Sequence, residues 1–154
     1  MSIKRTAAAL LAVLAGATAC GGAPPTRQEY AAQADRICRE AEQALERIED
    51  RPAATPQARG ELIAATQRSL RQVVQRLSEL ERPEGGAGRL AQAYVAQLDQ
   101  RADEVAPLLE RLRAALADDD VEAIRRAARA LETFEGAERA DELARRLGAR
   151  TCAG

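Results

Sequence analysis

Three cysteines are the residues of this chain best suited to covalent chemistry. Cys20 follows an apolar N-terminal segment, Cys38 falls in the first helical pattern, and Cys152 lies close to the C-terminus. The chain has no histidine, so neither an imidazole base nor a histidine metal ligand exists. The cysteines also lack the Cys-x-x-Cys spacing of redox sites. Thiol modification and disulfide formation are therefore the chemistry that these residue types favour.

The segment before Cys20 has the composition of an export signal. Lys4 and Arg5 precede an uncharged apolar stretch over residues 7–19, and the small residues Ala17-Thr18-Ala19 lead into the cysteine. A transmembrane helix needs about 20 apolar residues, and this stretch is shorter. The pattern is therefore typical of a signal segment that is removed from the mature chain.

This segment resembles a bacterial lipoprotein signal, whose lipobox ends in a cysteine, although Ala17 stands where leucine is commonest. The resemblance implies that residues 1–19 are a lipoprotein signal peptide and that Cys20 carries the lipid, a diacylglycerol with palmitate-type chains. Residues 20–25 would then be a lipidated tether holding the protein at the extracytoplasmic face of the cell membrane. The alternative is ordinary secretion with cleavage near Ala19.

With Cys20 lipidated, Cys38 and Cys152 remain as an even pair in an oxidising compartment. We expect a structural disulfide between them. It would close most of the chain into one loop, which the chain-entropy model values at about 4–5 kcal/mol. The alternative is a catalytic or metal-binding pair of thiols, and the absence of histidine weakens it.

Composition argues against several functions. The 23 basic and 24 acidic residues give a net charge of −1 and are interleaved, so no basic face for nucleic acid is expected. No glycine-rich loop has phosphate-binding spacing, and no carboxylate pair stands out in an apolar setting. We therefore expect no enzyme activity, no cofactor and no metal. With no Trp, two Tyr and one Phe, a large ligand cavity is also disfavoured.

The residues after the tether have the periodicity of amphipathic helices. Apolar side chains recur every three or four positions over residues 30–48, 62–80, 90–116 and 121–147. Breaks with proline, glycine or aspartate separate these stretches. The sequence therefore predicts an all-α fold, a four-helix up-down-up-down bundle with one disulfide, as a single domain over residues 26–154.

Helix ends are marked by their own residue types. Thr26 and Glu29 match a capping box, and Thr55-Pro56 supplies an N-cap followed by proline. Asp119 and Glu122 offer a second capping box, and Gly148 is expected to end the last helix. The run Asp118–Asp120 lacks the spaced ligands of a calcium loop and is better explained by capping than by cation binding.

Two features suggest candidate ligand sites. Pro107 inside the third helix would free the carbonyl of Asp103, so a bend opening a groove beside Asp103 and Glu104 is one interpretation and ordinary curvature around the core is the other. Gly136 in the fourth helix has the same two interpretations, a bend that opens a groove or ordinary curvature.

Tyr30 and Tyr94 lie near the starts of two parallel helices. They would line a small aromatic pocket or simply fill the core.

The sequences Asp35-Arg36-Ile37-Cys38-Arg39-Glu40 and Leu147-Gly148-Ala149-Arg150-Thr151-Cys152 carry a second resemblance. The whole domain is similar to a loose group of small actinobacterial secreted or lipid-anchored helical proteins of unknown function, in which a cysteine of the first helix is mirrored by one after the last. The resemblance implies a fold and a disulfide, and it carries no activity.

These observations lead to one functional hypothesis and one alternative. The first is a lipid-anchored, non-catalytic interaction or scaffold module at the cell envelope, which binds the membrane through Cys20 and presents a helix face to a protein partner. The alternative is a small-ligand binding protein or sensor. A ligand binder should have a concave pocket of a few hundred Å³ with converging polar groups. An interaction module should instead expose an apolar patch.

Overall fold

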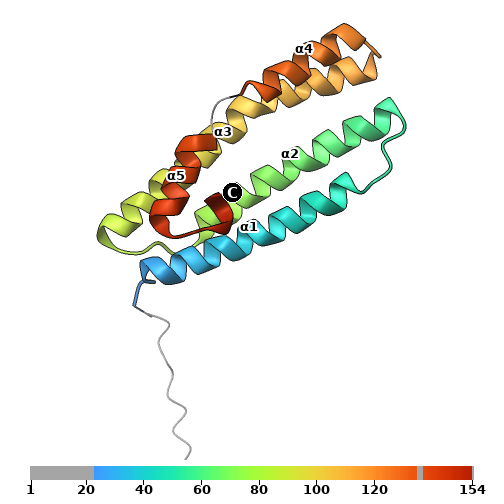
Figure 1. Ribbon diagram of the computed structural model, residues 1–154. Coiled ribbons are helices and arrows are strands. Elements are labelled where there is room, and N and C mark those ends of the chain that lie inside the picture. The colour runs from blue at the N-terminus through green and yellow to red at the C-terminus, as the bar shows by residue number, and fades with distance from the viewer. Residues whose placement is uncertain (1–22, 135–136, 154) are drawn as a thin grey trace, which may run out of the picture.

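The computed structural model describes residues 23–134 and 137–153, and this part of the chain is helical with no β-strand. Cys20, the lipidation candidate, and Gly136 lie outside it. The elements are α1 (Arg27–Glu49), α2 (Pro56–Glu79), α3 (Gly85–Ala117), α4 (Val121–Glu132), α5 (Ala137–Leu147) and a short 3₁₀ turn, η1 (Thr151–Ala153). The prediction of an all-α fold is confirmed (Figure 1).

The first two helices begin where the sequence predicts. At α1, the Thr26 side chain accepts from the Glu29 amide and the Glu29 carboxylate accepts from the Thr26 amide, so the capping box is complete. At α2, the Thr55 hydroxyl accepts from the Ala58 amide, with Pro56 at the first helical position. Both starts are set by local sequence.

Asp119 ends α3 in the left-handed conformation, with φ of 52°. The Asp119 amide donates to the carbonyl of Leu116, and the Asp120 amide donates to the carbonyl of Ala115. These two bonds form a Schellman motif, which normally holds glycine at the left-handed position. An aspartate in this place carries a steric cost that a glycine would not.

The predicted capping box of Asp119 with Glu122 is wrong. The N-cap of α4 is Asp120, whose carboxylate accepts from the Ala123 amide at 2.9 Å. Asp119 is unable to cap α4 because its backbone is committed to the end of α3. The aspartate run thus ends one helix and starts the next, as capping predicts.

A single helix over residues 121–147 is also wrong, because α4 and α5 are separate helices. The α4 helix ends at Glu132, and the hydroxyl of its C-cap residue, Thr133, donates back to the carbonyl of Arg129 at 2.9 Å. Side chains that bond to their own backbone compete with helix continuation. The Phe134 amide then bonds to the Leu131 carbonyl in a tighter turn, and the chain leaves the helix axis.

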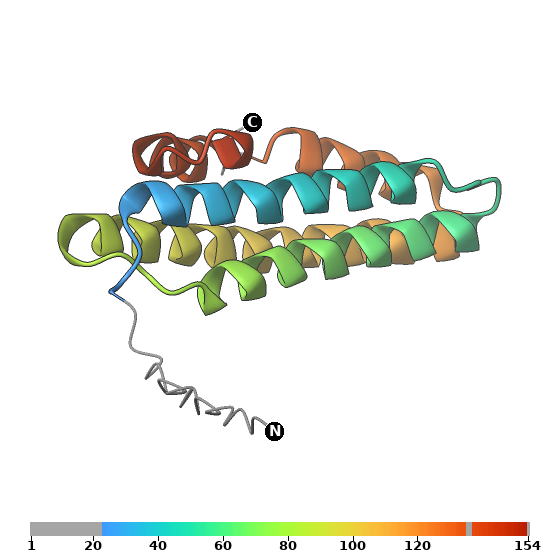
Figure 2. The ribbon, with the colours of Figure 1, turned by 90° about the horizontal axis from the view of Figure 1, so that it is seen from below.

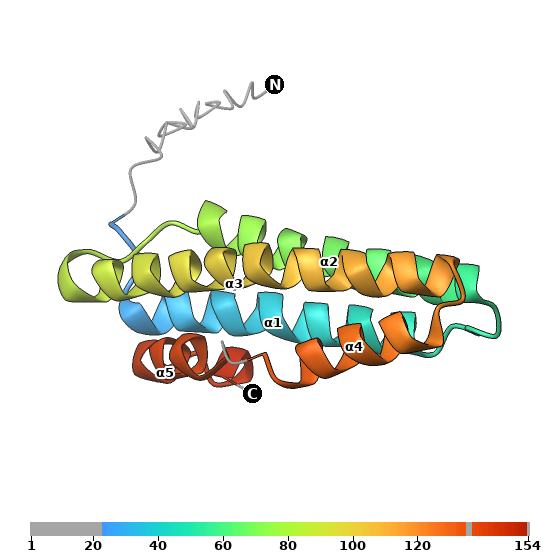
Figure 3. The same ribbon diagram turned by 90° about the horizontal axis from the view of Figure 1, so that it is seen from above.

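The long helix α3 organises the arrangement of the others. It packs against α2 along one side, against α5 near its own N-terminus and against α4 near its C-terminus (Figure 3). The α1 helix packs against α2 and meets the C-terminal part of the chain mainly through η1 (Figure 2). The substantial helix contacts of α4 are with α3 alone.

Burial is concentrated in one half of the molecule, which we call the disulfide half. The largest fully buried side chains are there: Tyr30, Leu77, Tyr94 and Leu147. In the opposite half, which holds α4 and the α1–α2 loop, Ile48 and Leu116 are buried but Val121 stays 54% exposed. The core is therefore dense at the disulfide half and incomplete beyond it.

The strained end of α3 gives a first prediction. Replacing Asp119 by glycine should raise the free energy of unfolding by about 0.5–1 kcal/mol, because glycine adopts positive φ without steric cost. Urea denaturation measures the change. Asp118→Gly is the matched control, since Asp118 has φ of −86° and should gain nothing. Equal gains in both variants would contradict the assignment.

Candidate functional site

The predicted disulfide is present, between Cys38 in α1 and Cys152 in η1. The two Cα atoms are 5.4 Å apart, within the usual range for a disulfide. The bond joins residues 114 positions apart in sequence, so nearly all of the described chain lies within the loop it closes. It attaches the C-terminal turn directly to the first helix.

Asp35 holds the same turn through its carboxylate. It lies three residues before Cys38, on the same face of α1. One oxygen accepts from the amides of Thr151 at 2.8 Å and Cys152 at 3.3 Å, and the other accepts from the amide of Arg150 at 3.2 Å. These are the amides that begin a helical turn and have no partner within it. Asp35 therefore acts as a side-chain cap supplied by another helix.

Gly148 directs the chain from α5 into this turn. The Ala149 amide donates to the carbonyl of Ala144 and the Gly148 amide to that of Arg145, completing a Schellman motif. Gly148 has φ of 90°, where side chains are rarely tolerated, and an added Cβ would lie 3.9 Å from that of Ala31. The predicted C-cap is confirmed. We call Asp35, Cys38, Gly148 and Cys152 together the C-terminal clamp.

Tyr30 and Tyr94 share the core beside this clamp, as their helical positions predict. Both side chains are buried, and the Tyr30 hydroxyl has no hydrogen-bond partner among the described residues. Burial raises the pKa of Tyr30, partly offset by the positive charge of Arg82. Burial also raises the pKa of Tyr94, and neighbouring Tyr30 adds to the rise. Both phenols are therefore neutral at ordinary pH.

The structure separates the residues proposed around Pro107. Pro107 itself is exposed within an α3 helix that continues past it, and Glu104 accepts from the Gln100 side chain at 2.8 Å. Asp103 lines a groove of about 440 Å³ between α2 and α3. The charged side chains of that groove are Arg71, Arg82, Asp99 and Asp103. Asp103 lines this groove, whereas Glu104, Pro107, Tyr30 and Tyr94 do not.

A smaller and more apolar cavity lies on the other side of the α2–α3 contact, with a volume of about 270 Å³. It opens beside Leu70, which exposes 36% of its surface. All of its lining comes from α2 and α3: Thr66, Leu70, Val73, Val74, Leu98, Arg101, Val105 and Leu109. We call it the α2–α3 cavity. Its helices match the predicted apolar stripes, but nothing in the apolar periodicity predicts space between them.

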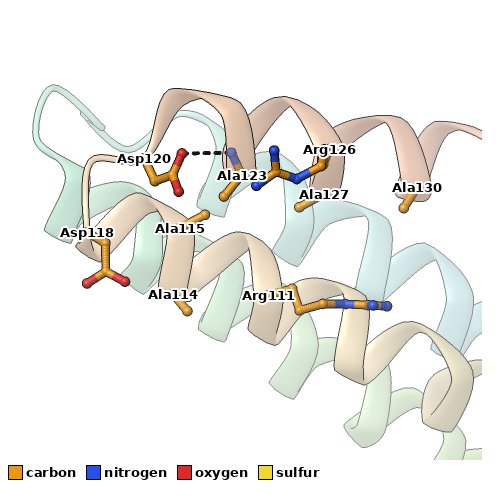
Figure 4. Close-up of a pocket in the computed structure, with 9 residues that line it drawn as sticks. All are labelled: Arg111, Ala114, Ala115, Asp118, Asp120, Ala123, Arg126, Ala127 and Ala130. Carbon is orange, nitrogen blue, oxygen red and sulfur yellow. Dashed lines mark hydrogen bonds between the residues drawn. The ribbon is translucent and has the colours of Figure 1, made fainter.

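A third hollow follows the contact of α3 with α4 (Figure 4). It measures about 430 Å³ and is floored by alanines, with Arg111, Arg126, Asp118 and Asp120 at its margins. Asp120 directs its carboxylate to the Ala123 amide as the cap of α4. Alanine leaves little side-chain volume between the helices, so this hollow follows from the composition of the two facing helices.

Among the described residues, no three His, Cys, Asp or Glu side chains are grouped closely enough to hold a metal ion. None of the helices in this part of the chain is long and apolar enough to cross a membrane. No protein-family model, no curated protein and no solved structure matches the chain. The site must therefore be interpreted from its own geometry.

The clamp generates a prediction for the disulfide. Replacing Cys38 and Cys152 together by serine should lower the free energy of unfolding by about 2–5 kcal/mol, because the unfolded chain loses a long covalent loop. Guanidinium denaturation of the variant, and of the unaltered protein with and without reductant, measures this. An unchanged midpoint would show that the disulfide does not constrain the fold.

Asp35 gives a second prediction. Asp35→Ala should lower stability by about 1–2 kcal/mol with the disulfide intact, since three backbone amides lose a charged acceptor. It should also speed reduction of the disulfide by dithiothreitol, because η1 is then held less firmly. Arg36→Ala, at an exposed neighbouring position, is the control. Equal reduction rates in all three proteins would argue against the role of Asp35.

Proposed function

We propose that this protein is a lipid-anchored, extracytoplasmic helical domain that serves as a non-catalytic interaction or scaffold module at the cell envelope. The observation that carries the proposal is the Cys38–Cys152 disulfide. Disulfides persist in oxidising compartments and are rare in the cytosol. The lipobox-like sequence ending at Cys20 supports the same location and supplies the anchor.

The tether places the domain near the membrane in this proposal. From Cys20, seven residues lead to Arg27, the first residue of α1. An extended chain of that length spans at most about 25 Å. The start of α1 belongs to the disulfide half, so the dense half faces the bilayer and the incomplete half points away from it.

The proposal includes a fold, a four-helix up-down-up-down bundle. In it, α4 and α5 together take the place of the fourth helix. Their contacts with opposite ends of α3 support this arrangement. In the described part of the chain, this division leaves α4 held mainly by α3, with Val121 largely exposed. Apolar surface in the membrane-distal half is where a protein partner would bind.

A small-ligand binding function is the second candidate, and the α2–α3 cavity favours it. Ligand pockets are concave, mostly apolar, and carry a few placed polar groups. The cavity is apolar apart from Thr66 and Arg101, and the Thr66 hydroxyl already donates to the Leu62 carbonyl at 3.1 Å. Arg101 alone is available to orient a ligand by charge.

The proposed location is tested by intact mass spectrometry of the full chain recovered from the membranes of a bacterial host. The expected species begins at Cys20, carries a diacylglyceryl adduct, and gains two alkylations only after reduction. Cys20→Ala is the matched control and should lose the adduct while keeping the disulfide. A cytosolic chain that begins at Met1 with free thiols at Cys38 and Cys152 would overturn the proposal.

A further inference from the structure

We infer that the α2–α3 cavity binds an amphipathic anion, a single alkyl chain ending in a carboxylate, with Arg101 as the residue that pairs with the carboxylate. The inference rests on the cavity and its one charge. It does not depend on whether Cys20 is lipidated.

The position of Arg101 is unusual for its charge. On α3 it lies three residues after Leu98 and four before Val105, so it shares their side of the helix. Both of those neighbours are apolar and line the cavity with it. The side chain is half-buried. A charge placed among apolar groups is costly unless it is paired.

No carboxylate within the described residues lies within ion-pair distance of Arg101. Glu104, one turn further along α3, accepts instead from the Gln100 side chain. Most arginines in this part of the chain are exposed and unpaired, but Arg76, which is half-buried like Arg101, pairs with Glu40 at 2.6 Å. The guanidinium of Arg101 therefore keeps its capacity for a planar, two-oxygen acceptor.

The other residues that line the cavity indicate the chemistry of the rest of the ligand. Leu70, Val73, Leu98 and Leu109 offer only alkyl surface, and Thr66 uses its hydroxyl within its own helix. An apolar cavity of about 150 Å³ holds benzene. The 270 Å³ here therefore suits a larger apolar group, such as a medium-length alkyl chain. An alkyl carboxylate satisfies the apolar lining and the free guanidinium together.

The test compares sodium octanoate with 1-octanol, which has an alkyl chain of equal length and an uncharged head. The protein is the full-length chain carrying Cys20→Ser, purified without detergent, so that no attached lipid competes. Titration followed by amide NMR shifts measures both affinity and location. We expect octanoate to shift amides around Leu70, Arg101 and Val105, and to bind at least about fivefold more tightly than octanol.

Three variants separate the parts of the inference. Arg101→Gln should weaken octanoate at least about fivefold and leave octanol unchanged. Leu70→Asn should weaken both ligands, since it alters only the apolar lining. Arg68→Gln, an exposed arginine of α2 that lines none of the cavities described above, should change neither.

Some results would overturn the inference. Octanoate and octanol binding equally well to the unaltered protein would remove the role of the charge. Shifts away from the cavity, or equal octanoate affinity in Arg101→Gln, would place the ligand elsewhere. None of these results bears on the lipid anchor, which the mass measurement tests separately.

Discussion

The attachment of η1 to α1 is the constraint on which the rest of the structure depends. The Cys38–Cys152 bond and the Asp35 carboxylate act on the same three-residue turn, one covalently and one through backbone amides. Because α1 meets α5 mainly through this turn, the clamp is what holds the last helix near the first. The dense core around Tyr30, Tyr94 and Leu147 lies beside it.

The same constraint explains why the opposite half is less complete. Among the described residues no comparable link joins α4 to α1 or α2, and the substantial contacts of α4 are with α3. Val121 on α4 stays largely exposed, and the α2–α3 cavity lies where the core should continue. A disulfide can compensate for a small hydrophobic core. Here the disulfide stabilises only the half of the molecule in which it lies. The accessible apolar surface lies in the other half.

The features that could be predicted from the sequence are those set by neighbouring residues or by residue type. Helix starts at Thr26 and Thr55 and the turn at Gly148 follow from capping rules, and the disulfide follows from an even pair of cysteines. The break at Thr133 was missed because the apolar periodicity runs on through it. The roles of Asp35 and Arg101 were missed because each depends on an element distant in sequence. Asp35 acts on η1, and Arg101 lines a cavity formed with α2.

Hydrogen exchange of the oxidised and reduced protein tests the central claim most directly. With the disulfide reduced, amides of α5 and η1 should exchange much faster, while those along the α2–α3 contact keep most of their protection. This outcome would show that the clamp holds the C-terminal part in place. Loss of protection throughout the protein, or no change in α5, would contradict the account.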